Sequence, residues 1–160
     1  DSYLTFITVH EVAHQWWYAR VGNDQAMTPW LDEALATYSE YVFYEEYYPQ
    51  LRDWWWQFRV NQYIPQDFDD RAVDSTVYEF TNIREYINAV YLRGARMLHA
   101  LRGDLSTEAF FNWLRRYAQA GQGRVATADL LWSLLTEAER ERTRETRETY
   151  LSQAVVEATE

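Results

Sequence analysis

The sequence predicts a mostly α-helical domain. Only five glycines and three prolines occur among 160 residues, which argues against a fold built on many tight turns. Apolar residues make up 48% of the chain, enough to form a core, and 18% of all residues are aromatic. The length is that of one ordinary domain. We therefore expect residues 1–160 to form a single helical domain.

The first two helices are predicted from apolar patterns and a start signal. Residues 3–20 are apolar nearly all round, as in a buried helix, and residues 21–24 predict a turn. Thr28 and Pro29 are typical of an N-cap and a first helical position, so the second helix is expected at residues 30–47.

Further helices and a tail are expected along the rest of the chain. Ser106 and Thr127 are predicted N-caps, and no segment has a convincing strand pattern. Residues 137–160 are expected to be a solvated or frayed tail, because residues 137–149 mix Glu, Arg and Thr without an apolar face. The remaining predicted helices cover residues 49–62, 83–102, 107–120 and 128–138.

Charge and composition exclude several classes of partner and chemistry. The net charge of −10 disfavours nucleic acid and anionic membrane surfaces, since both need basic patches. The chain has no cysteine, which excludes disulfides, thiolate metal sites and a cysteine nucleophile. No apolar run reaches the roughly 18 residues of a membrane span. We therefore expect no nucleic-acid partner and no membrane insertion.

Two histidines predict a metal site near the start of the chain. Residues 10–14 read H-E-V-A-H, which places His10 and His14 four apart on one face of a helix, where both imidazoles can bind one ion. Glu11 is turned about 100° from His10 and can act as a general base without being a ligand. Zinc suits such a site, because it is bound well by nitrogen and carboxylate ligands.

Glu33 is the expected third ligand. Eighteen residues separate it from His14, and it lies on the helix predicted after Thr28 and Pro29. One helix end, one turn and one helix start fit this interval. Two helices packed antiparallel would then bring Glu33 back to the histidines.

These residues resemble the gluzincin aminopeptidases of the aminopeptidase N type. The family pattern is H-E-x-x-H, eighteen residues, then Glu, and residues 30–38 read W-L-D-E-A-L-A-T-Y around Glu33. The resemblance implies the helical subdomain of a thermolysin-like (gluzincin) catalytic domain. It also implies one Zn²⁺ ion, a peptide substrate and removal of N-terminal residues from that peptide. In this family pattern His10, His14 and Glu33 bind zinc and Glu11 is the base.

A second segment carries the same resemblance. Residues 91–95 read Y-L-R-G-A, similar to the family's Y-x-K-G-A, whose Tyr hydrogen-bonds the oxyanion of the tetrahedral intermediate. The resemblance assigns this role to Tyr91 and places Arg93 where the family has Lys. Asp32 replaces the family's usual Asn, and residues 34–35 replace its Gly-Phe. Neither difference removes a ligand.

One family segment is not found in the sequence. The family carries a G-x-M-E-N segment upstream of the zinc motif, and its Glu captures the free α-amine of the substrate. Only nine residues precede His10, and they do not include it. We therefore expect the chain to be excised from a larger metallopeptidase, with the remaining domains of that parent chain as partners. The isolated fragment is expected to be inactive.

Two alternatives remain open. A thermolysin-type endopeptidase uses the same three ligands and the same base, and activity on N-terminally blocked peptides would favour it. A non-catalytic helical module with a vestigial site is the second alternative, and a protein that takes up no zinc would favour that.

Three other residues have open or structural interpretations. Glu40 lies seven residues past Glu33, where it could hydrogen-bond a ligand imidazole or be an ordinary solvated side chain. Tyr86 is more typical of packing than of a cleft wall. His99 is interpreted as structural.

Overall fold

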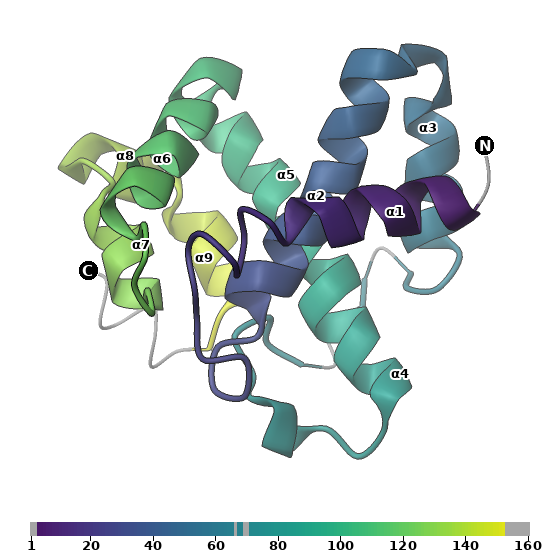
Figure 1. Cartoon of the computed structure of the whole chain (residues 1–160), viewed down its shortest axis with the longest axis horizontal. Coiled ribbons are helices and arrows are strands. Elements are labelled where there is room, and N and C mark those ends of the chain that lie inside the picture. Colours follow the sequence, from purple (N-terminus) through teal and green to yellow (C-terminus); the bar gives the residue numbers. More distant parts are fainter. Residues whose placement is uncertain (1–2, 66, 69–70, 153–160) are drawn as a thin grey trace.

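The computed structural model describes residues 3–65, 67–68 and 71–152, and this part is built from helices (Figure 1). Within these ranges the β-structure is limited to isolated bridges, which join Trp17 to Val21 and Gly22 to Val125. None of the described helices combines the length and the apolar character needed to cross a membrane. The α-helices are α1 (Tyr3–Ala13), α2 (Trp30–Tyr47), α3 (Arg52–Trp55), α4 (Ile83–Tyr86), α5 (Gly94–Leu105), α6 (Thr107–Ala120), α7 (Ala128–Ser133), α8 (Glu137–Arg142) and α9 (Arg144–Tyr150).

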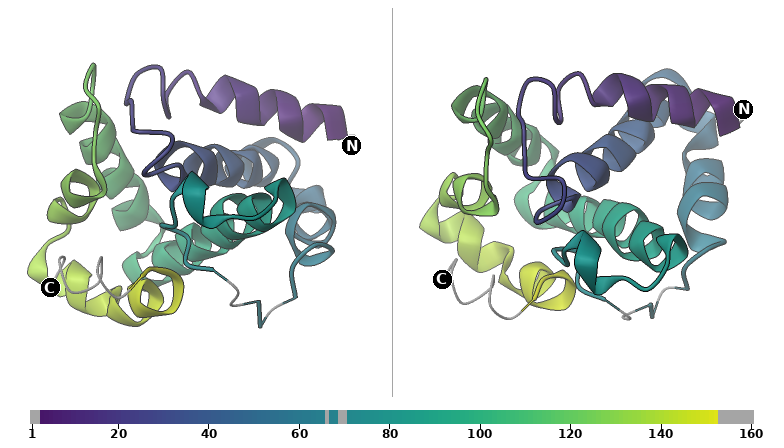
Figure 2. Two further views of the ribbon diagram at one scale, coloured as in Figure 1. Left: turned by 90° about the horizontal axis from the view of Figure 1, so that it is seen from below. Right: turned by 60° about the horizontal axis from the view of Figure 1, so that its bottom comes forward.

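Helix α2 forms the centre of the molecule. It packs against α1 on one side and against α5 on the other, as the two views of Figure 2 show. Most of its side chains are buried, because apolar and aromatic residues occur all round it. The buried residues of α2 are Trp30, Leu31, Asp32, Ala34, Leu35, Ala36, Thr37, Tyr38, Glu40, Tyr41 and Tyr44.

Two predicted helices contain π-helical segments. The run expected at 49–62 consists of a 3-10 turn η1 (Pro49–Leu51), helix α3 and the π-helical segment η2 (Trp56–Asn61). The run expected at 83–102 is helical from α4 through the π-helical segment η4 (Ile87–Arg93) to the end of α5. In a π-helix the backbone bonds span five residues instead of four, so each segment changes the direction in which later side chains point.

The prediction for the first helix is wrong at its C-terminal end. Helix α1 ends at Ala13, although the predicted helix continues to residue 20. The chain turns instead, with the backbone N–H of Ala19 donating to the carbonyl of His14 at 2.9 Å. The backbone of Tyr18 has a φ of 121°, which residues other than glycine rarely adopt. Such a residue cannot be part of an α-helix.

The predicted cap of α2 also differs from the structure. The Thr28 hydroxyl donates to the carbonyl of Asp24 at 3.1 Å, and α2 begins after Pro29 without a side-chain cap. The first turn of α2 instead holds the carboxylates of Asp32 and Glu33, which the positive end of the helix dipole favours. Ser106 and Thr127 do cap the helices that follow them, as predicted.

The predicted tail is ordered as far as the described residues reach. Residues 137–150 form α8 and α9, and Arg147 is buried in this region. The Arg93 guanidinium anchors α9 by donating to the carbonyl of Tyr150 at 3.1 Å and lying 4.9 Å above the Tyr150 ring. Arginine side chains and backbone carbonyls form this contact between η4 and α9. Residues 137–150 can therefore pack here without an apolar stripe. Residues 153–160 of the predicted tail lie outside the described residues.

The contact between α2 and α5 is so close that glycine is required at one position. A Cβ atom on Gly94 would lie 2.6 Å from Cβ of Ala34, whereas a Cβ atom on Gly103 would meet nothing within 4 Å. We expect Gly94→Ala to lower the free energy of unfolding by about 1–3 kcal/mol, because it forces α5 away from α2.

Gly103→Ala on the same helix is the matched control for this change. It should leave stability unchanged or raise it by up to about 1 kcal/mol, since alanine favours a helix more than glycine does. Urea unfolding followed by circular dichroism measures both variants. Equal free energies of unfolding for the two variants would show that the contact between α2 and α5 accommodates an added methyl group without loss of stability.

Candidate metal centre

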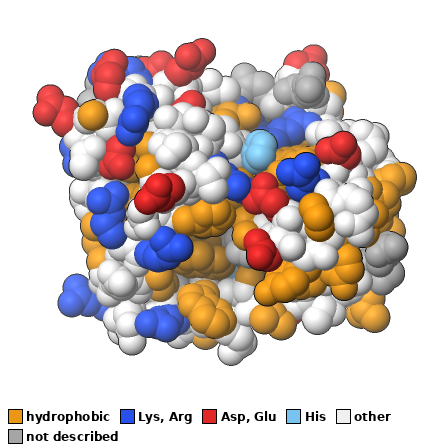
Figure 3. Space-filling view, turned by 90° about the horizontal axis from the view of Figure 1, so that it is seen from above, with side chains coloured by type: hydrophobic (Ala, Val, Ile, Leu, Met, Phe, Trp, Pro, Cys, Tyr) orange, Lys and Arg blue, Asp and Glu red, His pale blue; other side chains and the backbone are white. Residues whose placement is uncertain are grey.

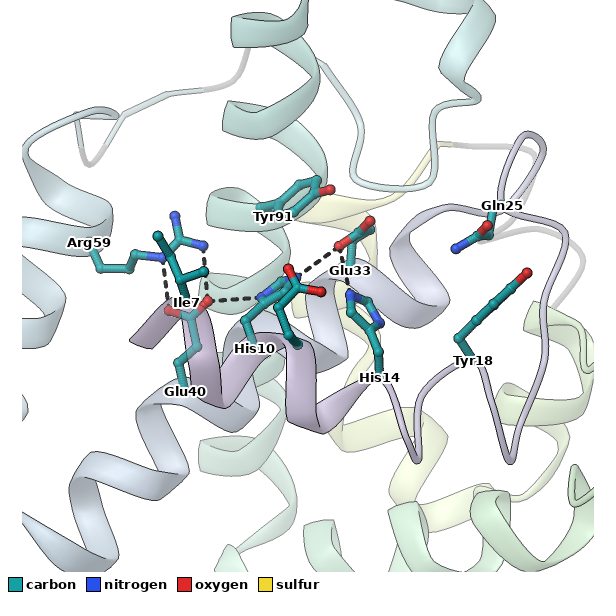
Figure 4. A pocket seen from close by; sticks show the side chains of 10 residues that line it. Ile7, His10, His14, Tyr18, Gln25, Glu33, Glu40, Arg59 and Tyr91 are labelled. Carbon is teal, nitrogen blue, oxygen red and sulfur yellow. Dashed lines mark hydrogen bonds and ion pairs between the residues drawn. The ribbon is translucent and has the colours of Figure 1, made fainter. Parts of the chain in front are cut away.

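The three predicted metal ligands meet where α1 crosses α2 (Figure 4). His10 Nε2 lies 3.0 Å from Oε2 of Glu33, and His14 Nε2 lies 3.4 Å from the same oxygen. One ligand atom from each of the three side chains lies within 4.8 Å of the other two. Two imidazole nitrogens and one carboxylate oxygen at this separation fit a zinc ion that keeps a further position open.

The elements bring these side chains together from two directions. His10 lies in the last turn of α1 and His14 just after it, with their rings edge to face and the centroids 4.8 Å apart. Glu33 lies in the first turn of α2 and reaches back to both rings. The structure thus places the two histidines one helical turn apart and Glu33 beside both of them, as the sequence predicts.

The neighbouring charges favour a proton on His10 and a negative charge on Glu33. Burial alone would lower the pKa of His10, but its hydrogen bonds to Glu33 and Glu40 outweigh this effect and raise the pKa to about 9. Burial alone would raise the pKa of Glu33, but hydrogen bonds from the two histidines lower it to about 2. A metal cation would take the place of this proton, because it binds the neutral imidazole and the ionised carboxylate.

The second nitrogen of each histidine ring is also held. His10 Nδ1 donates to Oε1 of Glu40 at 2.9 Å, and His14 Nδ1 donates to the carbonyl of Trp17 at 3.0 Å. Each bond fixes the ring so that Nε2 points to the centre. Glu40 is fully buried, so the structure supports the hydrogen-bonding alternative and excludes a solvated side chain.

Glu40 has further partners that the sequence did not indicate. Trp55 Nε1 donates to its Oε2 at 3.2 Å. Arg59 donates from Nε to Oε2 at 2.8 Å and from Nη2 to Oε1 at 2.9 Å. Arg59 lies on η2, and no motif or spacing rule connects it with the histidines.

A cavity of about 500 Å³ opens beside the three ligands. Glu11 lines it and is exposed, as expected for a base that must reach water. On the face seen in Figure 3, a histidine side chain is surrounded by acidic and basic side chains, with hydrophobic ones over much of the remaining surface. The residues lining the cavity are Ile7, His10, Glu11, His14, Tyr18, Gln25, Glu33, Glu40, Arg59 and Tyr91.

Tyr91 contacts His10, one of the predicted metal ligands. Its ring stacks on His10 with the centroids 5.7 Å apart and the planes 7° from parallel. Burial and the nearby charge of Glu33 raise the pKa of Tyr91 well above its usual value, so its hydroxyl stays protonated and can donate a hydrogen bond. Tyr91 thus faces the same cavity as Glu11.

Tyr86 and His99 are not among the residues that line this cavity. The Tyr86 ring packs edge-on against Tyr91 with the centroids 5.5 Å apart, which agrees with a packing role. His99 accepts or donates a hydrogen bond with the Tyr38 hydroxyl at 3.1 Å and lies among aromatic rings. Its surroundings agree with the structural interpretation.

Comparison with curated proteins finds aminopeptidases. Over 138 residues the chain is 30% identical to endoplasmic reticulum aminopeptidase 2 of Homo sapiens, a match of 84% of this chain and 14% of that protein. It is 29% identical over 147 residues to aminopeptidase N of Lactococcus lactis subsp. lactis, covering 84% of this chain and 17% of the relative. The chain therefore spans only a small part of these relatives.

Solved structures and family models agree with these matches. A variant of the M1 zinc metallopeptidase from Deinococcus radiodurans, bound to a Tyr-Ser-Ala substrate, superposes with a TM-score of 0.70 at 28% identity. This match covers 95% of our chain and 34% of the other, which confirms the expected helical subdomain of a gluzincin catalytic domain. The model of the Peptidase family M1 domain matches residues 2–150. The chain therefore belongs to peptidase family M1.

Proposed function

We propose that this chain provides the zinc site of an aminopeptidase that removes N-terminal residues from peptides. The observation that carries the proposal is the convergence of His10, His14 and Glu33, with their ligand atoms within 4.8 Å of one another beside an open cavity. Membership of family M1 and the similarity to named aminopeptidases support the same activity.

The chain's own residues can carry out the proton transfers of peptide hydrolysis. Zinc bound by the three ligands would polarise the scissile carbonyl and acidify a water molecule. Glu11 takes the proton of the attacking water and passes it to the leaving amine. Tyr91 donates a hydrogen bond to the oxyanion that develops on the carbonyl.

We further propose that other parts of the protein complete the cleft. The chain matches only 14–17% of the length of the relatives above. Several apolar side chains of α1 are exposed, including Leu4, Ile7 and Val12, and could pack against those parts. Recognition of the substrate's α-amine is assigned to those parts, and the isolated chain is expected to bind zinc without catalysing the reaction.

An endopeptidase with the same ligands is the rival enzyme. The curated matches reported above are aminopeptidases, which favours action at the free N-terminus. Hydrolysis of peptides whose amine is blocked would favour the rival. A non-catalytic module would take up no zinc.

Ligand assignment is tested by comparing two histidines. His14→Ala removes one of the three proposed ligands and should lower zinc affinity by more than about 100-fold. Loss of a residue that only hydrogen-bonds a ligand already lowers metal affinity by up to about 100-fold. His99→Ala removes the histidine among the aromatic rings and should leave zinc binding unchanged. Metal content after dialysis against a weak chelator measures both. Equal zinc content in the two variants would contradict the assignment.

Glu11→Gln tests the base in the full-length protein. The amide keeps the size of the side chain but cannot take a proton, so turnover of a chromogenic aminoacyl substrate should fall by about 10²–10⁴-fold. Zinc content should equal that of the wild type, because Glu11 is not a ligand. A variant that kept its rate would remove Glu11 from the mechanism.

Tyr91→Phe tests the oxyanion donor in the same protein. Loss of the hydroxyl should lower kcat by about 10²–10³-fold with a much smaller change in KM, because the hydrogen bond strengthens only as the oxyanion forms. Steady-state kinetics measures both constants. A rise in KM alone would indicate that Tyr91 merely binds substrate.

A further inference from the structure

We propose that Arg59 is a positioning residue for the metal site, because it clamps Glu40 and thereby holds the His10 ring in place. This inference rests on the proposed zinc site. Arg59 forms two parallel hydrogen bonds with Glu40, one to each carboxylate oxygen. Such a two-point contact fixes the plane of the carboxylate as well as its position. The oxygen Oε1 that accepts from Arg59 Nη2 also accepts from His10 Nδ1.

The clamp connects three elements of the fold. Glu40 lies on α2 and Arg59 on η2, while the Arg59 guanidinium lies 5.0 Å from the ring centre of Phe6 on α1. Phe6 is four residues before His10, so the two side chains lie on the same face of α1. Arg59 therefore contacts the helix that carries the histidine and the carboxylate that orients it. Figure 4 shows the row from Arg59 through Glu40 to His10 and Glu33.

Charge balance gives Arg59 a role beyond packing. Two carboxylates, Glu33 and Glu40, flank the single ring of His10. The positive charge of Arg59 balances the negative charge of Glu40. The negative charge of Glu33 then remains available to bind a metal cation. Without Arg59, the buried carboxylate of Glu40 would keep His10 and Trp55 as its donors among the described residues, and one carboxylate oxygen would lose the contact that fixes its position.

A second ion pair on α2 provides a matched control. Arg102 donates from Nη1 to Oε2 of Glu45 at 2.6 Å and lies 5.1 Å from the ring centre of Phe111, so it resembles Arg59 in its contacts. Glu45 also contacts the hydroxyl of Tyr41, at 3.5 Å, whereas Glu40 contacts a histidine of the site. Loss of Arg102 thus removes a similar ion pair without touching the candidate ligands.

The experiment compares zinc release from Arg59→Met, Arg59→Lys and Arg102→Met in the zinc-loaded full-length protein. Release is followed by absorbance of a chromogenic chelator. We expect Arg59→Met to release zinc about 10–100-fold faster than the wild type, and Arg102→Met to release it at the wild-type rate. Arg59→Lys keeps the charge but loses the fork, so its rate should lie between the two. If Arg59→Met does not fold, the rate of Arg59→Lys decides.

Glu40→Gln and its combination with Arg59→Met test whether Arg59 acts through Glu40. The double variant should release zinc no faster than Glu40→Gln alone, because the clamp has nothing left to hold. The visible spectrum of the cobalt-substituted protein should change for Arg59→Met and not for Arg102→Met, since it reports the geometry around the metal.

The outcomes separate this inference from the proposed function. A wild-type protein that binds zinc, with Arg59→Met and Arg102→Met releasing it equally fast, overturns the role of Arg59 and leaves the zinc site intact. Additive effects of Glu40→Gln and Arg59→Met would also overturn it. A wild-type protein that binds no zinc overturns the proposed function, and the role of Arg59 with it.

Discussion

The approach of Glu33 to the histidines of α1 is the contact on which the position of α1, and with it the candidate site, depends. Helix α1 buries only Phe6 and His10 within its described length, so few apolar contacts attach it to the body. The bonds from His10 to Glu33 and Glu40 join it to α2, which is buried along most of its length. The residues that form the site are therefore also the residues that hold α1 in place.

The two histidines are oriented by different means, and both depend on tertiary structure. His10 is held by the carboxylate of Glu40, which is in turn held by side chains of α3 and η2. His14 is held by the carbonyl of Trp17, which is available because α1 ends at Ala13 and the chain turns. The end of α1 at Ala13 thus allows the bond that orients His14. The turn that follows it also contains the strained backbone conformation of Tyr18.

Sequence patterns predicted the parts of the site that depend on local geometry. The pairing of His10 with His14 follows from helical spacing and the choice of Glu33 from its interval and its place on the next predicted helix, whereas Tyr91 needed the resemblance to a family. The clamp on Glu40 could not be predicted, because Arg59 reaches it through packing of separate helices. The prediction of a solvated tail was wrong for residues 137–152 for a related reason: Arg147 is buried and donates to the carbonyl of Arg140, and a search for apolar stripes does not detect such a contact.

The π-helical segments have a consequence for how this site can change over evolutionary time. Arg59 lies in η2 and Tyr91 in η4, so both depend on a wide turn that contains one residue more than an α-helical turn. Loss of the extra residue from either segment would restore a regular α-helical turn and leave the side chains beyond it facing as before, whereas the same loss from a regular α-helix would turn them by about 100°. A one-residue deletion within η2 or η4 would therefore change the wide turn that carries Arg59 or Tyr91 and leave the helix beyond it in register.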